Sequence, residues 1–230
     1  MRIVGVLALA VAGLGGCTAA RIEVPSALAA TTRKVELAGM GFGRRGDFTL
    51  GASSGTFTRH ALSEDDPQFF GSDRITSFFG DGSFSVQGAD FDGTVEGKCR
   101  YLESEATAGS ATITTIPFRY RCSFLRNGQP LQASLTLHAA PRAVGPLTAE
   151  TRAGWLEING RNFRIEPIHQ SPQLAIPTSE PLGYRFVASN SDVGAIDMNG
   201  ERKTIYAPAN GPVREAVLIG SLALSVLWKS

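Results

Sequence analysis

The last apolar segment of the chain, Ala216 to Trp228, constrains the fold more than any other feature. It holds about 13 residues without a charge, and apolar side chains would cover every side of a helix. Such a helix must be buried all round, and it is too short to cross a bilayer, which takes about 20 residues. Asn210, Pro212 and Glu215 suit its N-terminus as cap, first-turn residue and favourable charge. We therefore expect a buried helix over 212–228, although every second residue near its end is large and apolar, so a final strand is the alternative.

The residues between 33 and 207 follow a different hydrophobicity pattern. Short segments alternate apolar and polar side chains, and Gly, Asp, Asn or Pro separates them. This rhythm predicts about a dozen antiparallel strands at spacings typical of barrels and sandwiches. Four dipeptides match the preference of type I′ hairpin turns for two residues with positive φ: Asp81-Gly82, Asn127-Gly128, Asn159-Gly160 and Asn199-Gly200.

Few folds can accommodate many strands followed by a helix that is apolar on every side. The helix needs a closed or strongly curved sheet to cover all its faces. The sequence therefore predicts a mostly β domain over 33–230, an antiparallel barrel of about twelve strands that encloses the C-terminal helix. A β-sandwich is the alternative.

The C-terminal pattern resembles that of the tubby-like superfamily, which includes tubby domains, phospholipid scramblases and LURP-one-related proteins. The residues that carry the resemblance are Tyr184–Asn190, Gly194–Gly200, Ile205-Tyr206 and Ala216–Trp228. In that superfamily a β-barrel encloses a hydrophobic C-terminal helix, so the resemblance implies the same fold. Members bind phosphoinositides or are associated with lipid scrambling. No basic lipid-binding residue can be matched here, so this function is not carried over.

The N-terminus has the pattern of an export signal. Arg2 is followed by an uncharged apolar run, Ile3 to Leu14, which is too short to span a membrane. The stretch Leu14-Gly15-Gly16-Cys17 resembles the lipobox of bacterial lipoproteins, which implies a signal peptide over 1–16 and lipidation of Cys17. An ordinary signal peptide with a chance cysteine and a buried N-terminal helix are the alternatives.

The residues after Cys17 indicate where an exported chain would go. Residues 17–32 lack strand alternation and are expected to form a tether between the lipid and the folded domain. Thr18 stands where an aspartate would favour retention in the inner membrane, by resemblance to known sorting rules. We therefore expect an anchor on the periplasmic face, at the outer membrane.

Charge and cysteine content narrow the remaining options. The formal net charge is +1 with no long basic run, which argues against nucleic-acid binding. Cys99 and Cys122 form an even pair in a chain expected to reach an oxidising compartment, and both lie in predicted strands. We predict a disulfide between them; two buried free thiols are the alternative. Zinc-ligand spacing is missing at both cysteines.

Several patterns could support catalysis or metal binding, but each has a plainer interpretation. Gly51-Ala-Ser53-Ser-Gly55 fits a nucleophile elbow, with His138 or His169 as base, but a strand follows where a helix is needed. Asp81, Asp90 and Asp92 could supply oxygens to calcium, but Asp-Gly is common in tight turns and the EF-hand spacing is missing. His60, His138 and His169 share no ligand spacing. We expect no cofactor and no metal.

One cluster points to a partner surface. Arg142, Arg152, Arg161 and Arg164 flank Trp155 in the sequence. Strand alternation puts Trp155 on the same face as Glu157 and opposite Leu156, so it could be exposed, although core packing is the favoured alternative. An exposed Trp beside Arg is a common binding hot spot.

These features favour a lipid-anchored envelope protein that acts as a non-catalytic binding or structural module. Its partners would be the membrane, through the lipid, and an envelope protein. A carrier or sensor of a lipid-like ligand is an alternative that needs an apolar cavity in the barrel. A hydrolase using Ser53 is a further alternative.

Overall fold

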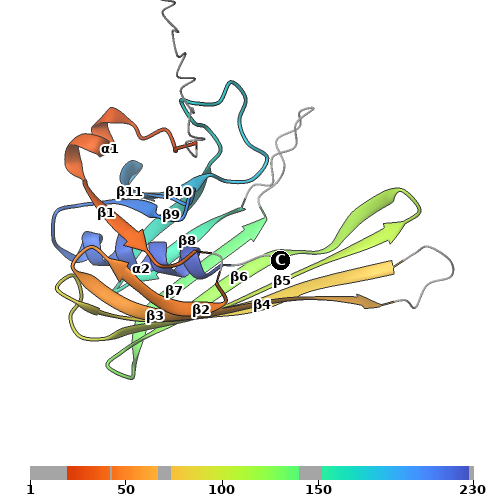
Figure 1. The fold of residues 1–230 in the computed structure, drawn as a ribbon, viewed down its shortest axis with the longest axis horizontal. Coiled ribbons are helices and arrows are strands. Elements are labelled where there is room, and N and C mark those ends of the chain that lie inside the picture. The colour runs from red at the N-terminus through yellow and green to blue at the C-terminus, as the bar shows by residue number, and fades with distance from the viewer. Residues whose placement is uncertain (1–19, 42, 67–73, 140–151, 228–230) are drawn as a thin grey trace, which may run out of the picture.

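The chain folds into a closed antiparallel barrel around its C-terminal helix, as a computed structural model shows (Figure 1). The structure describes residues 20–41, 43–66, 74–139 and 152–227. These residues form twelve strands and two helices: α1 (Ser26–Thr31), β1 (Arg33–Ala38), β2 (Arg45–Leu50), β3 (Ser53–Asp66), β4 (Arg74–Gly88), β5 (Val95–Ala108), β6 (Ala111–Arg126), β7 (Gln129–Ala139), β8 (Arg152–Ile158), β9 (Arg161–Ile168), β10 (Gly183–Ala188), β11 (Ser191–Asp197), β12 (Lys203–Ala207) and α2 (Pro212–Val226). Each strand pairs with its sequence neighbours, and β1 pairs with β12 to close the barrel. The predicted barrel is confirmed.

Helix α2 lies inside the barrel and supplies much of its core. Every residue from Ala216 to Val226 is buried. The all-round apolar character of this segment therefore matches its surroundings, because strands face it on every side. The helix ends at Val226, whereas the sequence predicted an end at residue 228, and Trp228 lies outside the described residues.

Charged pairs hold the N-terminal end of α2. The Arg214 Nε donates to Asp90 Oδ1 at 2.8 Å, and the Arg126 Nη2 donates to Glu215 Oε1 at 2.7 Å. All four side chains are mostly buried. The predicted cap by Asn210 is wrong: the N-cap residue is Gly211, and no side chain caps the helix. Ion pairs with the β4–β5 loop, through Asp90, and with the end of β6, through Arg126, fix this end in place of a cap.

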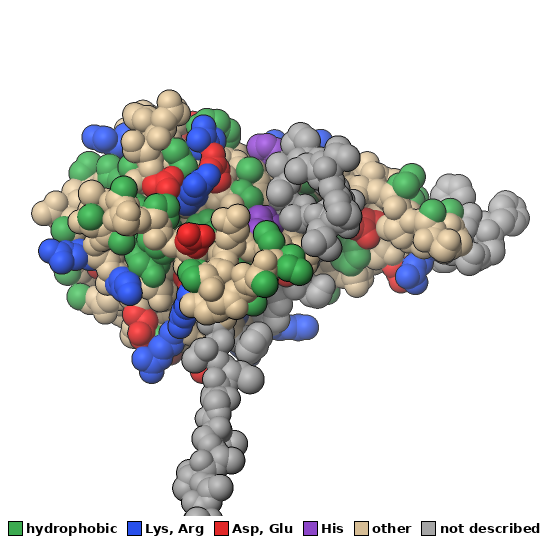
Figure 2. All heavy atoms as spheres, turned by 90° about the horizontal axis from the view of Figure 1, so that it is seen from above, with side chains coloured by type: hydrophobic (Ala, Val, Ile, Leu, Met, Phe, Trp, Pro, Cys, Tyr) green, Lys and Arg blue, Asp and Glu red, His purple; other side chains and the backbone are tan. Residues whose placement is uncertain are grey.

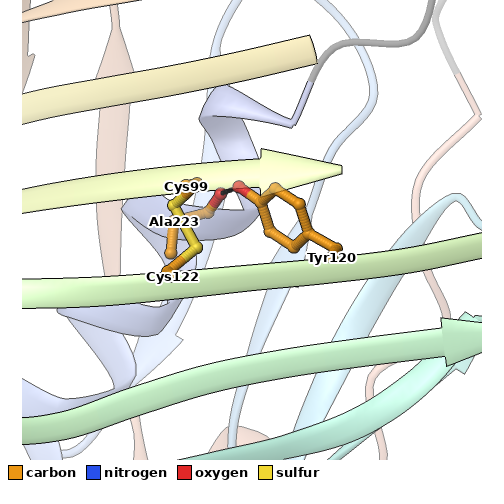
Figure 3. The surroundings of a disulfide bond; sticks show 4 residues. All are labelled: Cys99, Tyr120, Cys122 and Ala223. Carbon is orange, nitrogen blue, oxygen red and sulfur yellow. Dashed lines mark hydrogen bonds between the residues drawn. A yellow bond between two sulfur atoms is a disulfide. The ribbon is translucent and has the colours of Figure 1, made fainter. Parts of the chain in front are cut away.

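Hydrogen bonds from the wall satisfy carbonyl groups at the other end of α2. The Tyr120 hydroxyl donates to the Ala223 carbonyl oxygen at 2.5 Å (Figure 3). The Arg59 Nη1 donates to the Ser225 carbonyl oxygen at 3.2 Å. The last carbonyls of a helix lack partners within the helix. The C-terminal end of α2 can therefore be buried, because side chains of the barrel wall donate hydrogen bonds to its carbonyl groups.

Glycine lets α2 approach the wall closely, and it explains one wrong turn prediction. A Cβ on Gly82 would lie 2.7 Å from the Val226 carbonyl oxygen and 3.0 Å from its Cβ. Asp81-Gly82 is therefore not a turn: it lies within β4, where the missing side chain makes room for the helix.

The other three predicted turns do connect consecutive strands. Asn127 and Asn159 have φ of 51° and 49°, and the glycine after each also has positive φ, as type I′ turns require. At Asn199-Gly200 only the glycine has positive φ, so a type I′ turn is wrong there.

The predicted disulfide is present between neighbouring strands. Cys99 on β5 lies directly opposite Cys122 on β6, and both side chains are buried. Figure 3 shows the bond beside Ala223 of α2 and Tyr120. The disulfide therefore ties together two strands of the wall at a position that also contacts the central helix.

Four long strands project beyond the barrel. β2 pairs with β3 only as far as Thr58, and β7 pairs with β6 only from Arg119 onward. The far halves of β3, β4, β5 and β6 form an extension whose pairing continues to Asp66 and Ala111, and Figure 1 shows it reaching out to one side. Ile113 on this extension is 67% exposed.

The N-terminal segment departs from the tether predicted over residues 17–32. From Ala20 onward it lies against the barrel, and Ile22 and Leu28 are buried with Leu182 and Ala195 in a small second core. The Ile22 N–H also donates to Asp197 Oδ2 at 3.3 Å. The tether was predicted because the segment lacks the alternation of a strand. Ile22 and Leu28 nevertheless cover one patch of the barrel wall, which no local alternation reveals.

Candidate functional site: the outer wall around Trp155

Trp155 points outward from the barrel and is 50% exposed. Its neighbours Gly154 and Leu156 on β8 are buried on the inner face, as the strand alternation predicts. Core packing of Trp155, the favoured interpretation of the sequence, is therefore wrong. A half-exposed indole on a regular strand is unusual enough to mark this wall as a candidate binding surface.

Strand pairing builds a row of outward side chains across the wall. Arg100 on β5 lies opposite Arg121 on β6, which lies opposite Thr136 on β7. Thr136 lies opposite Trp155, which in turn lies opposite Arg164 on β9. We call these five residues the Trp155 row. Its framework is rigid, because each member sits on a strand that is paired on both sides.

The two ends of the Trp155 row differ in charge. The Arg164 Nε donates to Glu166 Oε1 at 2.5 Å, and the Arg185 Nη2 lies 2.5 Å from Glu166 Oε2. Burial acts to raise the pKa of Glu166, but the hydrogen bonds and charges of Arg185 and Arg164 outweigh it and lower that pKa overall. Glu166 is therefore an anion at neutral pH and neutralises much of the positive charge near β9.

Two like charges lie side by side at the β5–β6 end of the row, next to Asp81, which lies opposite Arg100 on β4. Arg100 and Arg121 are both exposed, and neither forms an ion pair with any residue in the described ranges. Directly opposite residues in an antiparallel pair have Cβ atoms about 5 Å apart, and like charges in such positions are destabilising. An anionic group bound between the two guanidinium groups would relieve this repulsion.

The other arginines predicted for this surface lie elsewhere. Arg152 is on the inner face, 8% exposed, with its guanidinium carbon 4.2 Å from the centre of the Phe118 ring. It precedes Trp155 by three positions, so the strand alternation turns it to the opposite side. Arg161 is exposed at the start of β9 beside the hairpin turn, and Arg142 lies outside the described residues.

The nucleophile elbow predicted around Ser53 is absent. Ser53 begins strand β3, and no helix follows it. Its side chain is buried, and the hydroxyl donates to Asp90 Oδ2 at 3.4 Å, a contact beside the N-terminal end of α2. These contacts give Ser53 a role in packing.

The predicted calcium ligands are separated as well. Asp81 accepts a hydrogen bond from His60 on the outer wall at 3.3 Å, Asp90 binds Arg214, and the Asp92 carboxylate lies 3.7 Å from Arg126. Among the residues described, no three His, Cys, Asp or Glu side chains gather closely enough to hold a metal ion. His138 is exposed on β7, while the His169 Nδ1 lies 2.9 Å from the Thr178 carbonyl oxygen.

The barrel interior bears on the ligand-carrier alternative. The side chains of α2 occupy the space that a carrier would leave for its ligand. A groove of about 480 Å³ lies instead on the outside, between the N-terminal segment and β9–β11, where Val24, Leu28 and Ile168 contribute to its walls. No helix within the described ranges has both the length and the apolar character needed to span a bilayer.

Comparisons with protein-family models, with curated proteins and with solved structures find no match for this chain. The site must therefore be interpreted from its own geometry.

Proposed function

We propose that this chain is a lipid-anchored envelope protein whose barrel acts as a non-catalytic binding module for an acidic protein partner. The observation that carries the proposal is the exposed indole of Trp155 in one row with Arg100 and Arg121, which have no ion-pair partner among the described residues. Trp and Arg are the residues most enriched at binding hot spots. Each of two adjacent guanidinium groups can donate two parallel hydrogen bonds to a carboxylate.

The lipid anchor rests on the stretch Leu14-Gly15-Gly16-Cys17, which lies outside the described residues. Diacylation with an added N-acyl chain exceeds the two signals that stable anchoring requires. We place the mature protein on the periplasmic face of the outer membrane because Thr18 follows the cysteine. The disulfide between Cys99 and Cys122 supports export to an oxidising compartment.

The barrel with its internal helix has the architecture that the resemblance to the tubby-like superfamily implies. Membership of that superfamily is part of the proposal, and its lipid-directed functions are not. Carriage of a lipid-like ligand is not proposed, because α2 occupies the interior.

Two measurements test the proposal separately. The anchor predicts that a metabolically supplied fatty acid labels the protein in a Gram-negative host and that Cys17→Ser abolishes the labelling. The surface predicts that Arg100→Glu together with Arg121→Glu eliminates co-purification of a discrete envelope protein. Arg161→Glu serves as the matched control, because Arg161 is exposed but lies outside the Trp155 row. Equal recovery with both sets of variants would contradict the proposal.

A further inference from the structure

The point where the N-terminal segment leaves the barrel is fixed by hydrogen bonds. The Asn199 side-chain Nδ2 donates to the Ala20 carbonyl oxygen at 2.7 Å. The Arg21 N–H donates to Gln173 Oε1 at 3.0 Å, and the Glu23 N–H donates to the Gln170 carbonyl oxygen at 3.2 Å. The chain is therefore attached to the body as far as Ala20, and it leaves beside the loop between β9 and β10, residues 169–182 (Figure 1).

Little chain separates this point from the proposed anchor. Only Thr18 and Ala19 lie between Cys17 and Ala20. Three residue steps of a fully extended chain span at most about 11 Å. A lipid on Cys17 would thus hold the loop between β9 and β10 next to the membrane surface, rather than letting the barrel move freely at the end of a long tether.

The same loop presents large apolar side chains to solvent. Leu174 is 41% exposed and Ile176 is 61% exposed. The loop base is held by hydrogen bonds, from the Leu174 N–H to the Ser171 carbonyl at 3.1 Å and from the Thr178 N–H to the His169 carbonyl at 2.9 Å. The loop tip is therefore preorganised, so its insertion into a membrane would cost little conformational entropy.

We infer that the tip of the β9–β10 loop, with Leu174 and Ile176, inserts into the interfacial region of the lipid bilayer as a second membrane contact beside the acyl chains. This inference rests on the proposed lipidation of Cys17. Because so few residues separate Cys17 from Ala20, a lipid on Cys17 would bring the loop to a lipid surface, which we therefore take as its binding partner. Arg21 bonds to Gln173 of this loop through its backbone N–H. Its half-exposed guanidinium lies 3.6 Å from Asp197 Oδ2, and its exposed part can meet lipid phosphates.

The surrounding surface is compatible with this contact. Figure 2 views the molecule from the top of Figure 1, where the β9–β10 loop lies, and it shows apolar side chains between scattered charges of both signs. A surface without a dense negative patch can approach lipid headgroups without strong repulsion. The second contact would fix the tilt of the barrel relative to the membrane.

The test measures how deeply the loop lies in the bilayer. Full-length Ile176→Cys is labelled with the environment-sensitive fluorophore NBD and placed in phosphatidylcholine vesicles, with and without brominated acyl chains. The matched control is Ile113→Cys, because Ile113 is similarly exposed but lies on the extension formed by β3–β6. Unsubstituted protein, treated identically, reports any labelling of the native cysteines. The mass of the N-terminal peptide establishes lipidation in every preparation.

The inference predicts that NBD at position 176 brightens on reconstitution and is quenched by the brominated lipid, whereas NBD at position 113 does neither. Lipidated protein with no quenching at 176, or with equal quenching at both positions, would overturn the inference and leave the proposed anchor intact. An unmodified Cys17 in the purified protein would instead overturn the anchor, and the inference with it.

Discussion

The hydrogen bond between Tyr120 and the end of α2 gives the sharpest test of how the helix is held in the barrel. The Leu227 N–H, which could continue the helix by bonding to Ala223, donates to Leu224 instead at 3.3 Å. The Ala223 carbonyl oxygen therefore depends on the Tyr120 hydroxyl, and both groups are fully buried. Burial, with a contribution from Tyr184, raises the pKa of Tyr120 well above its usual value, so the hydroxyl keeps its proton.

The substitution Tyr120→Phe keeps the ring and removes only this donor. Leaving a buried carbonyl without a partner costs about 1–3 kcal/mol. For a domain of this size each kcal/mol lowers Tm by about 2–4 °C, so we expect a fall of roughly 2–12 °C. The control is Tyr206→Phe, because Tyr206 is only partly buried and, within the described part of the chain, its hydroxyl makes no hydrogen bond.

Differential scanning calorimetry and chemical unfolding of both variants measure the difference. Tyr206→Phe is expected to change the free energy of unfolding by no more than about 0.5 kcal/mol. If Tyr120→Phe proves as stable as Tyr206→Phe, the Ala223 carbonyl does not depend on Tyr120, and the account of how α2 is fixed is wrong.

Three further predictions concern the same core. Replacing Cys99 and Cys122 together by Ala should lower the free energy of unfolding by roughly 3 kcal/mol in urea titrations, because the disulfide closes a loop with a sequence separation of 23. Gly82→Val should destabilise the fold by about 1–3 kcal/mol through its clash with Val226, seen as a lower urea midpoint. Burial, with the nearby Arg59 charge, lowers the pKa of Lys203 to about 8, whereas its value in the unfolded chain is 10.5. Between these two pH values the unfolded chain binds more protons than the folded one, so the free energy of unfolding should rise with pH across this window. Lys203→Met should remove that rise.

The barrel could be predicted because one segment left few alternatives. A helix with apolar side chains all round Ala216–Val226 cannot be covered by a flat sheet, and the strand rhythm supplied enough strands to surround it. The disulfide followed from the pair of cysteines that remains once Cys17 is set aside, because both lie in predicted strands. Both predictions depend on properties that are local in the sequence.

The failures arose where distant packing overrides local chemistry. Asp81-Gly82 has the chemistry of a turn, but Gly82 serves the approach of Val226, which lies far along the chain. Ile22 and Leu28 show no strand period, yet both cover a small patch formed by β9–β11. Such positions are set by tertiary contacts, which no local pattern reports.

The candidate site was partly accessible from the sequence. Alternation on β8 placed Trp155 opposite Leu156, and the structure exposes it. The arginine pair was missed, although the predicted disulfide contained the signal: once Cys99 lies opposite Cys122 in antiparallel strands, Arg100 must lie opposite Arg121.

Photo-crosslinking from position 155 in the full-length protein, in membranes of the expressing cells, tests the proposed binding surface most directly. A photoreactive phenylalanine analogue replaces Trp155, with Ile113 as the control position, and mass spectrometry identifies the products. The account predicts one discrete protein adduct from position 155 that disappears when Arg100 and Arg121 are changed to Glu. Capture of lipid alone, or of the same adduct from position 113, would contradict it.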